Sequence, residues 1–260
     1  MKISMRLDYT LEDYSLEDQI RIAADVGVDG VETGQLLDFD CEKAAALCAN
    51  YNVPFAACGY YDMWNARMGN PYEEIKDNLI KTIECAKTLG TSTLLSLTDN
   101  SEDRSEAFMQ QFVENMKPVA ELFEKHGMTA VVEPHNTVYH NPFYDFSKYY
   151  MNTTVIGYEA LKRIGSDSIK LLFDFYHVQT MEGNLIMNIK EHFDSIGHYH
   201  IAGVPDRDEP WNGELNYVNL VNLVDSMGYN GYFGMEYYPT DIKQTEVLAE
   251  AVRYLKTGKR

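Results

Sequence analysis

Eight short apolar runs, each followed by a helical pattern, alternate from one end of the chain to the other. Strict alternation of this kind over 260 residues predicts a (β/α)8 TIM barrel rather than an open doubly wound sheet. The runs are rich in Val, Ile, Leu, Phe, Tyr or Met, which favours strands. The predicted strands are residues 2–7, 29–33, 53–58, 92–97, 128–133, 168–174, 196–202 and 231–237.

The predicted helices contain two residues that disfavour a continuous helix. Pro118 is expected to kink or divide its helix near Lys117, whereas Gly183 is expected only to weaken the middle of its helix. No glycine-rich nucleotide motif follows any strand, and no linker or composition break divides the chain, so we expect a single domain over residues 1–260. The predicted helices are residues 15–27, 41–51, 71–90, 102–127, 153–165, about 177–193, 217–228 and about 241–255.

The charge of the chain limits its partners. A formal net charge of -18 and a pI near 4.7 argue against binding to nucleic acid or to anionic membranes. The first ten residues are typical of a strand rather than a signal peptide, and no apolar run approaches the roughly 18 residues of a membrane span. We therefore expect a cytoplasmic protein with no membrane contact. One or two arginines would still suffice to bind a small anionic substrate.

The cysteines are all in the first third of the chain and form no CxxC pair. They are expected to be buried, reduced thiols. The four residues are Cys41, Cys48, Cys58 and Cys85.

A side chain able to bind a metal ends each of four successive predicted strands in the second half of the chain. In a TIM barrel the C-terminal strand ends converge on one mouth, where three carboxylates and one imidazole would repel one another without a cation. Oxygen-rich ligation with one histidine suits Mg²⁺ or Mn²⁺. The predicted ligands of one divalent ion are Glu133, Asp174, His200 and Glu236.

Several of these residues also have a purely structural interpretation. Asp174 alone could cap a helix, and His200 alone could be a hydrogen-bonded core histidine. His198, two residues earlier on the same strand face, is expected to point into the barrel as a packing or hydrogen-bonding group. The coincidence of four ligand types at four strand ends favours the metal site.

Residues in the loops at the same mouth are harder to interpret. His135 either orients a ligand or covers the rim of the barrel. Trp64 and Trp211 either narrow the pocket or anchor their loops against the barrel.

Three segments carry a resemblance to a known family: KLLFDFYHVQTMEGNL, IGHYHIAGVPDRDEPWNGELNY and GYFGMEYYP. Together they resemble hydroxypyruvate isomerase and its close relatives in the xylose isomerase-like TIM barrel superfamily, which also contains ketose 3-epimerases. The resemblance is densest over residues 131–239 and looser before them.

The resemblance implies a divalent metal at the barrel mouth and isomerisation of the aldose–ketose type. The four predicted ligands match the family's metal ligands, and Glu133 and Glu236 also match the two carboxylates that handle the proton. His177 matches a substrate-contacting histidine, and Arg207 matches an arginine of the loop after the seventh strand. His135 is a further candidate for substrate contact.

Two positions depart from the hydroxypyruvate isomerase pattern. These isomerases usually carry Gln where this chain has His200, whereas the ketose 3-epimerases carry His, and the loop reads RDEP in place of RHEP. Arg207 in that loop could alternatively pair with Glu209 or Glu214.

The leading hypothesis is an isomerase of a small α-hydroxy carbonyl compound, with hydroxypyruvate to tartronate semialdehyde as first candidate. A ketose 3-epimerase is the alternative, and a sugar or cyclitol lyase would use the same groups. A DNA-repair endonuclease of the same barrel superfamily would need more histidines than the 7 present and a basic surface, and a non-catalytic subunit would have lost a carboxylate. The expected partner is a small hydroxy-carbonyl or sugar substrate, and the sequence leaves a homo-oligomer open.

Overall fold

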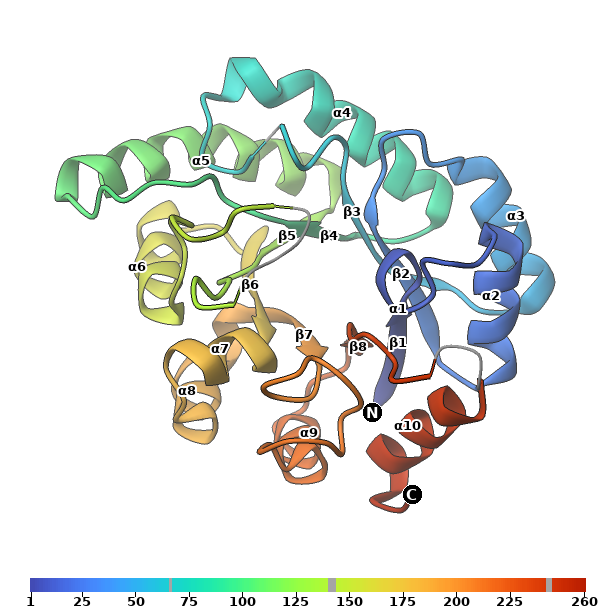
Figure 1. Ribbon diagram of the computed structural model, residues 1–260. Coiled ribbons are helices and arrows are strands. Elements are labelled where there is room, and N and C mark those ends of the chain that lie inside the picture. Colours follow the sequence, from blue (N-terminus) through green and yellow to red (C-terminus); the bar gives the residue numbers. More distant parts are fainter. Residues whose placement is uncertain (66, 140–143, 242–244) are drawn as a thin grey trace.

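The eight strands form a closed parallel barrel in chain order, with helices around the outside (Figure 1). The computed structural model describes residues 1–65, 67–139, 144–241 and 245–260. The barrel closes where the first strand pairs in parallel with the last, with Met5 opposite Met235. The predicted TIM barrel is confirmed.

Most strands are slightly shorter than predicted, whereas β2 and β3 begin and end later in the chain than predicted. They are β1 Lys2–Arg6, β2 Gly30–Gln35, β3 Phe55–Tyr60, β4 Thr93–Ser96, β5 Thr129–Val132, β6 Ile169–Asp174, β7 Ile196–Ile201 and β8 Tyr232–Met235. The helices are α1 Leu7–Thr10, α2 Leu16–Asp25, α3 Cys41–Tyr51, α4 Tyr72–Leu89, α5 Glu106–His126, α6 Thr154–Ile164, α7 Phe175–Met181, α8 Leu185–His192, the 3-10 helix η1 Phe193–Ser195, α9 Tyr217–Ser226 and α10 Thr245–Thr257.

The outer helices bury one face against the barrel. In α2, Ile20 and Ala23 are fully buried, and the Ser15 hydroxyl accepts the backbone N–H of Asp18 at the start of the helix. This cap satisfies one of the free N–H groups at the helix N-terminus. Ile20 and Ala23 lie three residues apart on one face, so α2 packs on the barrel as an amphipathic helix.

Two helices differ from the prediction. The segment around Pro118 forms one helix, α5, so of the two expected outcomes, a kink or a division near Lys117, the division is wrong. Proline leaves the carbonyl four residues earlier without its partner, and that residue is the exposed Glu114, where water can bind. The segment 177–193 is instead divided, because Gly183 and Asn184 both have left-handed backbones that end α7 before α8 begins. The last helix was expected from about Asp241 to Leu255, and the structure describes it as Thr245–Thr257, whereas residues 242–244 lie outside the described residues.

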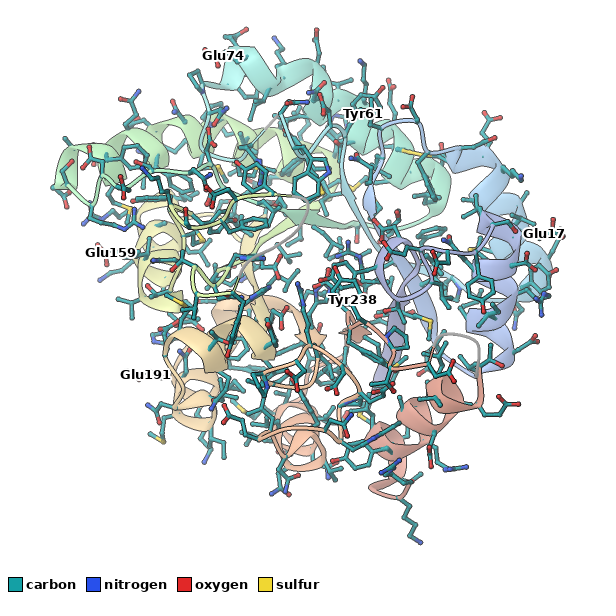
Figure 2. The ribbon with its side chains drawn as sticks, in the orientation of Figure 1. Glu17, Tyr61, Glu74, Glu159, Glu191 and Tyr238 are labelled. Atoms are coloured by element: carbon teal, nitrogen blue, oxygen red, sulfur yellow. A yellow bond between two sulfur atoms is a disulfide. The ribbon has the colours of Figure 1, made fainter. Side chains whose placement is uncertain are left out.

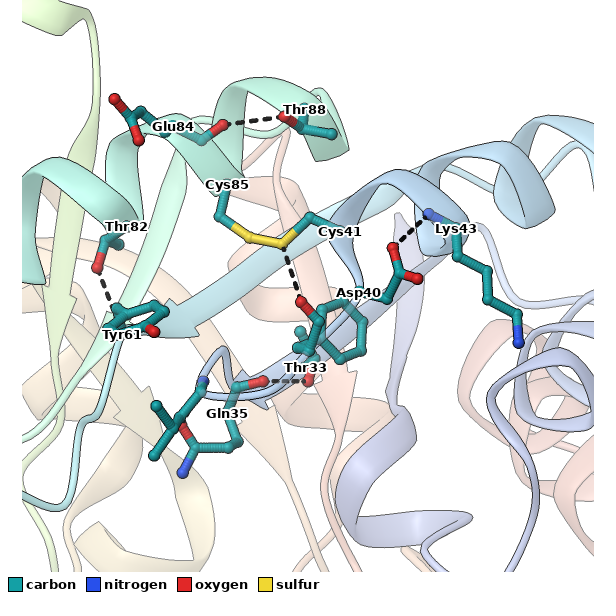
Figure 3. Close-up of a disulfide and its surroundings, with 12 residues drawn as sticks. Thr33, Gln35, Asp40, Cys41, Lys43, Tyr61, Thr82, Glu84, Cys85 and Thr88 are labelled. Atoms are coloured by element: carbon teal, nitrogen blue, oxygen red, sulfur yellow. Dashed lines mark hydrogen bonds between the residues drawn. A yellow bond between two sulfur atoms is a disulfide. The ribbon is translucent and has the colours of Figure 1, made fainter.

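Cys41 and Cys85 form a disulfide between α3 and α4, which corrects the expectation that all four cysteines are reduced (Figure 3). The two helices pack side by side, and this brings Cα atoms that are 44 residues apart in the sequence to within 5.9 Å. This pairing depends on how the two helices pack, which the spacing of the cysteines does not reveal. Cys48 and Cys58 are free and buried, as predicted.

Acidic side chains cover the outer helices. Figure 2 shows Glu17, Glu74, Glu159 and Glu191 around the periphery, whereas Tyr238 lies near the middle of the view.

Among the residues the structure describes, no helix combines the length and the apolar character needed to cross a bilayer.

Candidate active site

The four predicted ligand side chains come together at the C-terminal mouth of the barrel. One ligand atom from each lies within 4.8 Å of the others, and all four residues are buried. The backbone ladder fixes the glutamates just beyond their strands, since the N–H of Glu133 donates to Ser96 and that of Glu236 donates to Ile201. Their proximity follows from the barrel, while their role as metal ligands stays a prediction.

The donor set fits a divalent cation. Within the described part of the chain, Glu133 Oε1 and Asp174 Oδ2 are buried and have no hydrogen-bond partner. Buried carboxylate oxygens without a partner are costly, and a cation between them would remove that cost. The other oxygen of Asp174 accepts the N–H of Tyr176 at 2.8 Å and caps α7, so Asp174 both caps a helix and faces the cluster. Three carboxylates with one imidazole suit Mg²⁺ or Mn²⁺.

Two arginines hold Glu236. Arg6 Nη1 donates to Glu236 Oε1 at 2.5 Å, and Arg207 Nη2 donates to Oε2 at 2.8 Å. His200 Nδ1 also lies 3.2 Å from Oε2. Arg207 therefore pairs with Glu236 rather than with Glu209 or Glu214, which accept hydrogen bonds from other residues.

Arg6 was not among the predicted site residues. It ends β1, and this position of a charged residue at a strand end is the signal by which the sequence could have indicated it. Asp8 orients Arg6 by accepting from its Nε at 3.2 Å and is itself fixed by the N–H groups of Gly34 and Gln35. A Cβ at Gly34 would lie 2.1 Å from Arg6 Nη2, so only glycine leaves room for this guanidinium.

The environments of the two candidate catalytic glutamates differ. Burial, together with the nearby carboxylates Glu236 and Asp174, raises the pKa of Glu133 to about 8. Burial also opposes ionisation of Glu236, but Arg6, His200 and Arg207 outweigh it and hold the pKa of Glu236 well below its usual range. A pair of carboxylates with such separated pKa values is suited to serve as an acid and a base.

His200 lies between two carboxylates. Burial alone would lower its pKa, but Glu236 and Glu32 raise it to about 10. Metal binding requires a neutral imidazole, so a cation in the cluster would take the place of the proton on Nδ1.

His177 faces the two carboxylate oxygens that lack a partner. Its Nε2 lies 3.5 Å from Glu133 Oε1 and 3.4 Å from Asp174 Oδ2. Asn136 uses its oxygen to accept two backbone N–H groups, so its Nδ2 donates to His177 Nδ1 at 2.6 Å. Burial, with nearby His135 and Arg207, holds the pKa of His177 well below its usual range. The neutral ring thus carries its proton on Nε2, toward the cluster.

His135 stacks between two rings. Its centroid lies 3.7 Å from that of Phe146 and 3.8 Å from that of His177, and its Nδ1 donates to the Asn136 carbonyl at 2.8 Å. Burial, with nearby Arg207, lowers the pKa of His135 to about 3. His135 is therefore an uncharged ring that lines the site and packs against the ring of His177.

A cavity of about 260 Å³ opens above the cluster. Its lining includes Arg6, Arg207 and Trp64, together with the two candidate catalytic glutamates, Glu133 and Glu236. Trp64 lines the pocket and also packs on Tyr144 with ring centroids 5.6 Å apart, whereas Trp211 packs on Tyr254 of α10 with ring centroids 5.9 Å apart.

A second polar layer lies beneath the four ligands. Glu32 in β2 is fully buried and lies 3.0 Å from Nε2 of His198 and 3.0 Å from Nε2 of His200. The inward orientation predicted for His198 is confirmed. Glu32 was missed because it lies within its strand rather than at its end.

The chain belongs to the xylose isomerase-like TIM barrel family, whose model matches residues 20–258. It is 27% identical over 248 residues to the hydroxypyruvate isomerase of Escherichia coli (strain K12), covering 92% of this chain and 94% of that protein. It is 39% identical over 128 residues to the 2-oxo-tetronate isomerase of Cupriavidus necator, a match that spans 49% of this chain and 47% of that protein. A crystal structure named as an AP endonuclease, family 2, from Brucella melitensis superposes with a TM-score of 0.87 at 28% identity, covering 98% of this chain and 99% of that one.

Proposed function

We propose that this chain is a metal-dependent isomerase of a small hydroxy-keto acid, with hydroxypyruvate to tartronate semialdehyde as the first candidate reaction. The main support is the buried cluster of three carboxylates and one imidazole at the barrel mouth, beside a cavity lined by Arg6 and Arg207. The two relatives named as isomerases of hydroxypyruvate and of 2-oxo-tetronate also support it.

The reaction moves one proton between adjacent carbons. A base removes a proton from C3 of hydroxypyruvate, and the C–H electrons form an enediolate. The C3 hydroxyl proton moves to the C2 oxygen, and an acid returns a proton to C2, which leaves an aldehyde at C3 and a hydroxyl at C2. Glu133 and Glu236 both line the cavity, so they are the candidate carboxylates for these two proton transfers. A divalent ion held by Glu133, Asp174, His200 and Glu236 would supply Lewis-acid stabilisation of the developing negative charge.

The substrate carboxylate needs a cationic partner in this acidic protein. Arg207 lines the cavity, and its loop is fixed by backbone bonds from Arg207 N–H to Gly203 and from Tyr238 N–H to the Arg207 carbonyl. A guanidinium can bind a carboxylate through two parallel hydrogen bonds. His177, with its proton on Nε2, is suited to donate to a substrate oxygen.

A substrate panel tests the proposal directly. Protein loaded with Mg²⁺ or Mn²⁺ should isomerise hydroxypyruvate or a longer 2-oxo acid, and EDTA should abolish turnover. The panel should also contain neutral ketoses and a DNA duplex for nicking. Turnover confined to ketoses, DNA nicking, or full activity after metal removal would each contradict the proposal.

The Arg207→Lys variant should distinguish carboxylate recognition from a general effect. Lysine keeps the positive charge but cannot form the two parallel hydrogen bonds that a guanidinium makes to a carboxylate. KM for hydroxypyruvate should therefore rise by roughly 10–100-fold. Any neutral ketose turned over serves as the internal control, and its KM should change much less. Equal changes for both substrates in steady-state assays would mean that Arg207 does not bind the carboxylate.

A ketose 3-epimerase is the second candidate function. His200 favours it, since the ketose 3-epimerases carry His at this position whereas hydroxypyruvate isomerases usually carry Gln. Preferred turnover of a neutral ketose by the wild-type protein would select this candidate.

A further inference from the structure

Glu32 is the centre of a buried hydrogen-bond network below the metal-competent cluster. Its Oε1 accepts from the Ser4 hydroxyl and from His198 Nε2, and its Oε2 accepts from His200 Nε2. All of these side chains are at most 2% exposed. The network spans β1, β2 and β7. It therefore connects strands on either side of β8, the strand that closes the barrel by pairing with β1.

We propose that Glu32 is a positioning residue that keeps the proton of His200 on Nε2 and thereby leaves Nδ1 available to a divalent cation. The proposal rests on the metal dependence stated under the proposed function. It does not depend on the identity of the substrate.

The argument follows from donor and acceptor chemistry. An ionised carboxylate only accepts hydrogen bonds, and a neutral imidazole carries a single proton. With Glu32 Oε2 at 3.0 Å from His200 Nε2, that proton belongs on Nε2. The remaining nitrogen, Nδ1, is the one that faces Glu236 Oε2 in the cluster, at 3.2 Å. A carboxylate behind a ligating histidine fixes both its tautomer and its ring orientation.

The backbone leaves room for this contact at one glycine. Gly234 of β8 pairs with both Ser4 and His200 in the strand ladders. A Cβ at this position would lie 2.7 Å from Glu32 Oε1 and 2.7 Å from His200 Cδ2. Any larger residue would push the carboxylate and the imidazole out of their present positions.

Metal affinity of purified protein without substrate is the first test. Glutamine at position 32 offers one acceptor and one donor, so it cannot accept from both histidines. Glu32→Gln should raise the dissociation constant for Mn²⁺, measured by calorimetric titration, by about 10–100-fold. Gly234→Ala should change it in the same direction without altering any ionisable group.

Ser4→Ala is the matched control. It removes a buried hydrogen bond to the same carboxylate, but to the oxygen that faces His198 rather than His200. Its dissociation constant should stay close to that of the wild type. A Glu32→Gln value equal to that of Ser4→Ala would overturn the proposal, and so would a second Mn²⁺ ion ligated by Glu32.

A spectroscopic test remains decisive even if the Gln variant does not fold. In wild-type protein loaded with diamagnetic Mg²⁺, ¹⁵N NMR of the imidazoles should place the proton of His200 on Nε2. A proton on Nδ1 would overturn the proposal. A protein that binds metal with this tautomer but isomerises no hydroxy-keto acid would contradict the proposed function and leave the role of Glu32 standing.

Discussion

Replacing Glu236 by Gln is expected to lower turnover by about 10²–10⁴-fold with metal at saturation, the usual contribution of a general acid–base group. The amide has nearly the same shape but cannot take up the proton. Arg6 keeps its contact with Asp8, and Arg207 keeps its bond to Tyr9, so the fold should survive. Steady-state kinetics together with thermal unfolding of the same preparation make the measurement.

Glu12 supplies the matched control for this variant. It is an exposed carboxylate lining the same cavity. Glu12→Gln should leave turnover near the wild-type value. Near-normal turnover of Glu236→Gln would mean that the two-glutamate mechanism is wrong.

The Asp174→Asn variant should bind metal much more weakly. Asparagine retains an oxygen that can accept the Tyr176 N–H and cap α7, so the local fold should be preserved. The anionic Oδ2, which has no hydrogen-bond partner among the described residues, is lost. Since ligand charge strongly tunes the affinity of such sites, the dissociation constant for Mn²⁺ should rise by roughly 100-fold.

Excess Mn²⁺ distinguishes a metal ligand from a catalytic group. Activity of Asp174→Asn should recover in part as the Mn²⁺ concentration rises, whereas that of Glu236→Gln should not recover at saturating metal. Unchanged Mn²⁺ affinity in Asp174→Asn would remove this residue from the predicted ligand set.

The barrel and the four clustered residues were predictable because both depend on periodic features of the sequence. Alternating strand and helix patterns define the fold, and the topology then brings every strand end to one mouth. Glu133, Asp174, His200 and Glu236 needed no knowledge of side-chain packing to be assigned to that mouth.

The rest of the site depends on contacts across the barrel. Arg6 binds Glu236, and Glu32 binds His200, although each pair is far apart in the sequence. Whether a buried charge within a strand faces a partner depends on strand register and on small residues such as Gly34 and Gly234. The Cys41–Cys85 pair was missed for the same reason, since it depends on how α3 packs against α4.

The bond between Arg6 and Glu236 also bears on the order of folding events. The two residues are 230 positions apart in the sequence, and they meet only when β8 pairs with β1. Contacts of such separation form late, because loop closure has to precede them. A partly folded chain that has assembled β5 to β7 would hold Glu133, Asp174 and His200 but lack Glu236, which follows β8, and Arg6 on β1. High metal affinity should therefore arise with the last step of assembly, which makes the cation a natural probe of barrel closure during refolding.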